Sequence, residues 1–130
     1  MSKLIISTSK SPKAIGPYSQ AINVKGGITF TSGQIPLDPK TGNLVSDEFD
    51  EQVIQTLKNL EGILIERNCK LNSIIKLTVY ITDLSNFNKL NIIFENFFDK
   101  GNYPARSVVE VSKLPKNSQI EIEGIFYDES

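Results

Sequence analysis

Histidine is absent from this chain of 130 residues, and Cys69 is its only cysteine. The chain therefore cannot form a zinc site of the usual Cys/His kind, a Ser–His or Cys–His nucleophile pair, or an internal disulfide. Any proton transfer must use Asp, Glu, Lys, Tyr or bound water. Cys69 follows the predicted end of a helix, where we expect its thiol to be structural rather than reactive.

An excess of charge of one sign is also missing. Fourteen basic residues stand against 15 acidic ones, which gives a net charge of −1. Such a balance provides no broad basic field, so bulk attachment to nucleic acid or to an anionic membrane is not supported. No apolar run is long enough to cross a bilayer, and the apolar N-terminal stretch is too short for a signal peptide. We expect a cytoplasmic or organelle-matrix protein with no nucleic-acid and no membrane partner.

The chain contains a series of predicted strands and helices without a repeat or a linker, so we expect one domain over residues 1–130. Two apolar runs flank Gly26 and Gly27, which predicts a hairpin. Residues 36–47 are rich in turn formers and are expected to form a loop. The predicted strands cover residues 3–7, two segments within 21–32, and residues 75–82, 107–111 and 120–127.

Apolar residues at three- and four-residue intervals predict two helices. The first begins near Asp47, is closed by Asn68 and Lys70, and carries the stripe Val53, Leu57, Leu60 and Leu64. The second extends from about Ser85 to Gly101, with the stripe Phe87, Leu90, Phe94 and Phe97.

The resulting order of elements is typical of an α+β protein, in which two helices pack on one face of a mixed sheet. Alternation along the strands then places a semi-polar set of residues on the other face: Lys76, Thr78, Tyr80, Glu121 and Glu123. This face is too apolar to stay bare and too polar for a sealed core. We expect self-association to cover it, and sites often form where subunits meet.

Only two of the basic residues are arginines. Arg67 lies among polar residues near the predicted helix end, where any cation would serve. Arg106 opens a β-type run, where a charged head must be paired or face an open cavity. Its flat guanidinium matches a carboxylate or a phosphate in a way that lysine does not. The alternative is a structural ion pair, with Glu110 or Glu123 as the partner.

Four further positions could contribute to a site. Glu121 and Glu123 alternate in a strand, and a carboxylate in a partly dry cleft exchanges protons near neutral pH; a solvated polar face is the alternative. Tyr18 lies in a turn and could cap a pocket or pack at the edge of the core. Gly33 ends a strand where a ligand could approach the backbone, although turn formation alone would explain it. Gly26 and Gly27 lack the spacing of a phosphate-binding loop.

Several segments together resemble the RidA family of reactive intermediate deaminases, also called the YjgF/YER057c/UK114 family. The most specific is Pro104-Ala105-Arg106-Ser107, followed after Leu114 by Ile120-Glu121-Ile122. Residues 14–21, 31–36 and 79–84 match as well, and the similarity covers nearly the whole chain. The resemblance implies a chorismate-mutase-like (YjgF-like) fold, assembled as a homotrimer with three clefts between subunits. It also implies hydrolysis of 2-imino acids, or their enamine tautomers, to 2-oxo acids and ammonia, without a cofactor or a metal.

The resemblance also implies roles for individual residues. Arg106 would bind the substrate carboxylate, and Glu121 would position or deprotonate water. Tyr18, Gly33 and Asn91 would line the same cleft. Many members have cysteine two residues after the signature arginine, where this chain has Val108, which offers a backbone N–H but no thiol.

The implied substrates are 2-iminobutanoate and 2-iminopropanoate, which dehydratases release from threonine and serine. An alternative is a non-catalytic regulatory trimer that captures small carboxylates, but binding alone needs only Arg106, not Glu121. Relatives have also been described as ribonucleases or translation inhibitors. The absence of histidine and of a basic patch argues against that role here.

Overall fold

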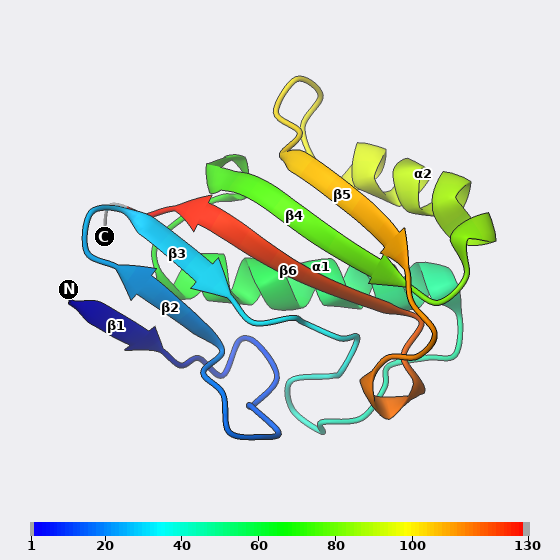
Figure 1. Cartoon of the computed structure of the whole chain (residues 1–130), viewed down its shortest axis with the longest axis horizontal. Coiled ribbons are helices and arrows are strands. Elements are labelled where there is room, and N and C mark those ends of the chain that lie inside the picture. The colour runs from blue at the N-terminus through cyan, green and yellow to red at the C-terminus, as the bar shows by residue number, and fades with distance from the viewer. Residues whose placement is uncertain (1, 129–130) are drawn as a thin grey trace.

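A computed structural model describes residues 2–128 of the chain. One six-stranded sheet has the order β1-β2-β3-β6-β4-β5 (Figure 1). All neighbouring strands are antiparallel except β4 and β5, which are parallel. The strands are β1 (Lys3–Ile6), β2 (Ala21–Val24), β3 (Ile28–Thr31), β4 (Ile74–Ile81), β5 (Ala105–Glu110) and β6 (Ile120–Tyr127).

Two α-helices, α1 (Phe49–Glu66) and α2 (Phe87–Phe97), cover one face of this sheet (Figure 1). This arrangement confirms the predicted α+β class with a mixed sheet. The predicted stripe of α1 is also confirmed, because its four residues are at most 3% exposed. The helix ends at Glu66, and Asn68 follows in the left-handed region with φ 57°. A short polar side chain tolerates this conformation, which stops helical hydrogen bonding.

The prediction for α2 is partly wrong. Leu90 and Phe94 are buried, but Phe87 is 38% exposed and Phe97 is only half-buried. The Asp83 side chain accepts a hydrogen bond from the Ser85 backbone N–H and caps a short 3-10 turn, Leu84–Asn86. This turn delays the start of α2 to Phe87, and the helix ends at Phe97, before Gly101.

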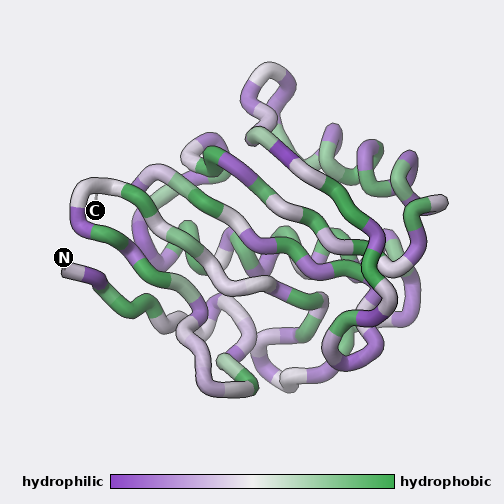
Figure 2. The backbone as a smooth tube through the Cα atoms, in the orientation of Figure 1, coloured by the Kyte–Doolittle hydropathy of each residue, from purple (hydrophilic) through white to green (hydrophobic). Residues whose placement is uncertain are grey.

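Alternation along β4 and β6 separates the two faces of the sheet. Leu77, Val79, Ile120 and Ile122 are fully buried beneath the helices, whereas the residues between them are half-buried on the open face. Figure 2 shows the corresponding alternation of hydrophobic and hydrophilic residues along these strands. The alternation predicted from residue 75 is wrong at its first position. Ile75 is 45% exposed, because the β4–β6 register shifts between Ile74 and Lys76.

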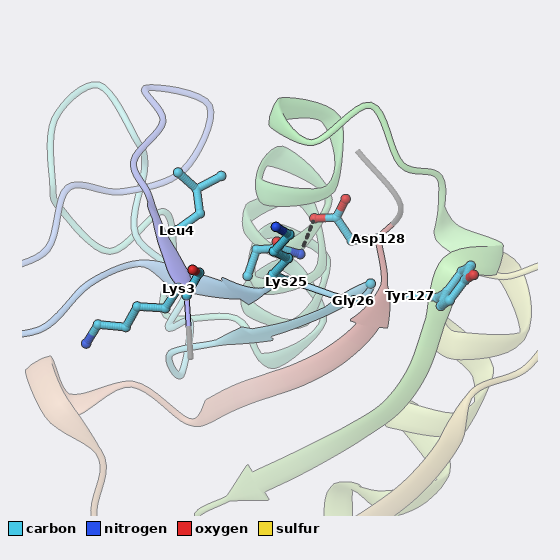
Figure 3. A pocket seen from close by; sticks show the side chains of 9 residues that line it. Lys3, Leu4, Lys25, Gly26, Tyr127 and Asp128 are labelled. Atoms are coloured by element: carbon cyan, nitrogen blue, oxygen red, sulfur yellow. Dashed lines mark hydrogen bonds between the residues drawn. The ribbon is translucent and has the colours of Figure 1, made fainter.

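The β2–β3 turn contains Gly26 and Gly27, as predicted for a hairpin, with φ values of 122° and 111°. Beside this turn is a cleft of about 460 Å³ (Figure 3), lined by Ser2, Lys3, Leu4, Asn23, Lys25, Gly26, Gly27, Tyr127 and Asp128. It lies at the end of the sheet where β2 meets β3.

The buried charge at this end of the sheet corrects the expectation for Arg67. Arg67 Nε lies 2.7 Å from Asp128 Oδ2, and the Asp128 side chain is fully buried. The same oxygen also accepts hydrogen bonds from Asn23 and Thr29. A buried carboxylate needs a paired and directional cation, so it is wrong that any cation would serve at position 67.

Neither helix within residues 2–128 is long and apolar enough to cross a membrane.

Candidate active site

Arg106 lies on β5, the strand at one edge of the sheet, and its side chain turns toward α2. One terminal nitrogen donates a hydrogen bond to Asn91 Oδ1 at 2.8 Å. The guanidinium carbon lies 5.0 Å from the ring centre of Phe94 and 5.5 Å from that of Phe87. These ring faces attract the cation and restrict its orientation. Burial lowers the pKa of the guanidinium, which nevertheless stays protonated at neutral pH.

The structure contradicts the structural ion pair considered for Arg106. Glu110 accepts from the Leu84 backbone N–H at 2.8 Å, and Glu123 accepts from the Tyr80 hydroxyl at 2.5 Å. Within residues 2–128 no carboxylate lies in salt-bridge range of Arg106. The guanidinium instead borders a cleft of about 390 Å³ lined by Asn91, Phe94, Glu95, Tyr103, Pro104 and Arg106. A planar cation at such a cleft can bind the carboxylate of a ligand through two parallel hydrogen bonds.

The backbone of β5 presents further donors at the edge of the sheet. The Val111 N–H donates to Ile81 O on β4 at 2.8 Å. Because successive N–H groups of a strand point to opposite sides, the N–H groups of Arg106 and Val108 point to the open edge of the sheet. The Val108 side chain packs against the core, opposite Val79. Position 108 can therefore serve a ligand through its backbone while its side chain stabilises the fold.

Glu121 lies on β6 and points to the open face of the sheet. A Cβ added at Gly33 would overlap its carboxylate, so the close approach of these residues requires glycine. The approach is fixed by two backbone hydrogen bonds between Gln34 and Ile122, of 2.8 and 3.0 Å. The carboxylate lines a cleft of about 300 Å³ together with Ile15, Tyr18, Ser32, Gly33, Ile35 and Pro115.

The protonation of Glu121 depends on this setting. Burial, and secondly the nearby charge of Glu123, raise the pKa of the Glu121 carboxyl above its ordinary value. A carboxylate with increased proton affinity can accept a proton from water and return it later. A carboxyl group in this setting can therefore exchange protons with a bound water molecule.

Tyr18 lines the same cleft and is 45% exposed, so it does not pack at the edge of the core. Its hydroxyl oxygen accepts a hydrogen bond from the Ile15 backbone N–H at 3.1 Å. This bond folds the ring back onto its own loop beside the Glu121 cleft.

The residues considered from the sequence fall into two separate groups. Arg106 pairs with Leu77 and shares the helix-covered face with Asn91, whereas Glu121 pairs with Tyr80 on the open face. β4 separates the two strands, so the two α-carbons are on the order of 14 Å apart. Within one chain, Arg106 and Glu121 therefore cannot contact the same small molecule.

Sequence reasoning did not identify the aromatic support of Arg106. Phe94 lies three residues after Asn91, so both residues occupy one face of α2. This spacing indicates the pair, but from the sequence alone the core stripe is sufficient to explain Phe94. The hydrogen bond between Tyr80 and Glu123 was also not expected.

Comparison with known proteins identifies the family. The family model described as Endoribonuclease L-PSP matches residues 8–127. A RutC family protein of Pyrococcus abyssi is 47% identical over 129 residues, which cover 99% of this chain and 100% of that protein. The human 2-iminobutanoate/2-iminopropanoate deaminase is 47% identical over 121 residues, 93% of this chain and 87% of the human protein. The chain belongs to the RidA family.

Solved structures support the same assignment for the fold. The crystal structure of Escherichia coli TdcF with bound serine matches with a TM-score of 0.89 and 41% identity, covering 95% of this chain and 98% of that one. The Escherichia coli YjgF structure matches with a TM-score of 0.89 and 43% identity, over the same shares of the two chains. The YjgF-like fold is therefore confirmed. The names of the deaminase relatives support a reactive intermediate deaminase role for the RidA family.

Proposed function

We propose that this RidA family member hydrolyses 2-imino acids, or their enamine tautomers, to 2-oxo acids and ammonia, with 2-iminobutanoate and 2-iminopropanoate as substrates. The main supporting observation is that Arg106 borders a cleft and has no carboxylate partner within residues 2–128. Glu121 adds a carboxyl group with raised proton affinity. The human relative named for this activity and the serine-bound relative agree with a small substrate that carries a carboxylate.

The active form is proposed to be a homotrimer in which Arg106 of one subunit meets Glu121 of the next. This arrangement would unite two groups that lie on opposite faces of one chain. The open face also exposes apolar side chains that a second copy could cover: Ile5 is 60%, Phe30 47% and Tyr127 48% exposed. Covering such a face is favourable because apolar surface leaves water.

The proposed reaction begins with binding of the substrate carboxylate by Arg106 through two charge-assisted hydrogen bonds, aided by the Val108 N–H. Glu121 takes a proton from a water molecule whose oxygen attacks the imine carbon, and the C=N bond becomes a single bond. The protonated Glu121 then supports proton delivery to the nitrogen of this carbinolamine. The carbinolamine hydroxyl then loses its proton, which Glu121 relays to the nitrogen. The C–N bond breaks, ammonia leaves, and the electron pair left on oxygen forms the C=O bond of the 2-oxo acid. Positioning could supply much of the acceleration.

Two alternative functions are less well supported. A regulatory trimer that only captures carboxylates would gain nothing from a second carboxylate, Glu121, in the same cleft. The endoribonuclease description of the family model is not extended to this chain. With no histidine and a net charge of −1, the sequence lacks both the usual acid–base residue and a broad basic surface for RNA.

A coupled assay tests the activity. Threonine dehydratase and threonine generate 2-iminobutanoate, and formation of 2-oxobutanoate is followed with and without this protein. We expect the protein to accelerate this step and Glu121→Gln to lose most of the acceleration, because an amide cannot take a proton from water. Binding of a stable carboxylate such as 2-oxobutanoate should survive in the variant. Binding without any acceleration by the parent protein would favour the regulatory trimer.

Mixing of subunits tests the shared site. Arg106→Ala and Glu121→Gln trimers should each be inactive, but unfolding and refolding them together should restore activity. Random assembly makes about one quarter of the interfaces intact. Light scattering on the parent protein provides the second readout. A mass near the 14.5 kDa of one chain, or no recovery in a mixture shown to contain mixed trimers, would contradict the shared site.

A further inference from the structure

Glu121 has two polar neighbours on the open face that the proposed reaction does not use. Tyr80 on β4 is the direct cross-strand partner of Glu121, and Glu123 lies two residues further along β6. The Tyr80 hydroxyl does not bond to its direct partner. It donates a hydrogen bond diagonally to Glu123 Oε1 at 2.5 Å.

This bond fixes the position of Glu123. Its acceptor oxygen is held toward Tyr80, so the carboxylate cannot turn freely into solvent. The same bond is the largest cause of a raised pKa of Tyr80. A fixed negative charge is therefore present beside Glu121 on the same face of β6.

We propose that Glu123, anchored by the Tyr80 hydroxyl, is a positioning residue whose fixed charge keeps a proton available on Glu121. This inference rests on the proposed function, in which Glu121 first takes a proton from water and then supports its delivery to nitrogen. Glu123 contacts neither the water nor the imine. It acts only through Glu121, by opposing a second negative charge nearby.

The other titratable groups around Glu121 do not replace this effect. β4 contributes Tyr80 and, further along the same face, Lys76, which forms no salt bridge with any described residue. The loop before β2 contributes Tyr18, and the turn after β5 contributes Lys116 beside the lining residue Pro115. Gly33 and Ser32 carry no charge. Among all these groups, Glu123 is the one whose charge raises the pKa of Glu121, in addition to burial. In the proposed trimer, Arg106 of the next subunit also faces this cleft and is unchanged by the variants below.

The test compares Glu123→Gln with the parent protein in its native assembly. Removing the charge should lower the pKa of Glu121, so the acidic limb of the kcat/KM profile should move to lower pH by about 0.5–1 unit. Tyr80→Phe should move the limb in the same direction by less, because Glu123 is then free to turn into solvent. Glu51→Gln, which removes one exposed carboxylate on α1, is the matched control and should leave the limb in place.

A second measurement needs no substrate. The carboxyl carbon of Glu121 is followed by NMR during a pH titration of the parent, Glu123→Gln and Glu51→Gln proteins. A lower midpoint in Glu123→Gln alone supports the inference, even if the parent shows no deaminase activity and the proposed function fails. An unchanged midpoint and an unchanged acidic limb in an active enzyme would overturn it. An unchanged profile in Tyr80→Phe would remove Tyr80 from the proposal.

Discussion

Arg67 and Arg106 are the two arginines of the chain, and they lie in opposite electrostatic settings. Arg67 is bound to Asp128, a fully buried carboxylate that also accepts hydrogen bonds from Asn23 and Thr29. Arg106 has Asn91 and two aromatic rings beside it, and no carboxylate partner within the described part of the chain. One charge is neutralised inside the fold, while the other is held in place without being neutralised.

The same distinction applies to the acids. Asp128 is surrounded by donors, whereas Glu121 lies beside Glu123, another acid, and has a raised pKa. Removing one partner of a buried charge pair destabilises the fold, whereas a charge without partners is a candidate for binding or catalysis. Mutations at the Arg67 end should therefore change stability, whereas mutations in the Arg106 and Glu121 clefts should change activity.

The largest effect is expected at the Arg67 end. Arg67→Met leaves the buried Asp128 without its cation and should lower the free energy of unfolding by about 3–5 kcal/mol. Urea denaturation at pH 7 measures this change. Lys10→Met breaks the exposed Lys10–Glu66 salt bridge and should have little effect, so equal changes in the two variants would contradict the distinction.

The second prediction concerns a loss of activity without a loss of stability. Arg106→Lys keeps the charge but loses the planar fork, which should reduce kcat/KM roughly tenfold to a hundredfold. Arg106→Ala should reduce it further, while the melting temperature of both variants stays near that of the parent. Loss of the assembly in Arg106→Ala would instead assign Arg106 a structural role.

A third prediction concerns the close contact of Gly33 with Glu121. Alanine at position 33 would displace the carboxylate, and misplacement of a reacting group by about 1 Å can cost up to a hundredfold in rate. We expect kcat to fall at least about tenfold while KM changes little. In the Glu121→Gln background the same substitution should cost much less, because both changes act through one carboxylate. Additive losses would show that Gly33 acts otherwise.

The smallest expected effect is a change in melting temperature that differs in sign between variants of Glu121 and of Asp128. The folded-state pKa of Glu121 is raised above 4.5, so ionisation costs stability as the pH rises through that value. Glu121→Gln should therefore raise the melting temperature at pH 7 by about 1–3 °C. The gain should vanish in acid, where Glu121 is already protonated. Asp128→Asn should lower the melting temperature at pH 7, and a shift of the same sign in both variants would contradict the comparison.

Local patterns were sufficient to predict much of the fold. The stripe of α1 and the alternation of β4 and β6 depend on spacing alone, and both are confirmed except at Ile75. Local patterns did not predict the bulge that exposes Ile75 or the 3-10 turn that delays α2. These features depend on strand register and on one side-chain cap, Asp83.

Predictions for the site were limited by sequence distance. The bond from Arg67 to Asp128 and the approach of Gly33 to Glu121 join residues far apart in the chain, so no local spacing indicates them. Motif resemblance suggested Arg106 and Glu121 as partners. It could not show that the two side chains lie on opposite faces of the sheet.

The central place of β6 in the sheet has a consequence for the order of folding. β6 is the last strand within residues 2–128, yet it lies between β3 and β4 and joins the hairpin strands to the β4–β5 pair. The sheet therefore cannot close on a ribosome until β6 has emerged from the exit tunnel. Until then the apolar faces of β3 and β4 stay exposed, a condition that promotes aggregation of nascent chains. Slow translation of the segment before β6 would lengthen this exposure, and the strand that carries Glu121 ends it.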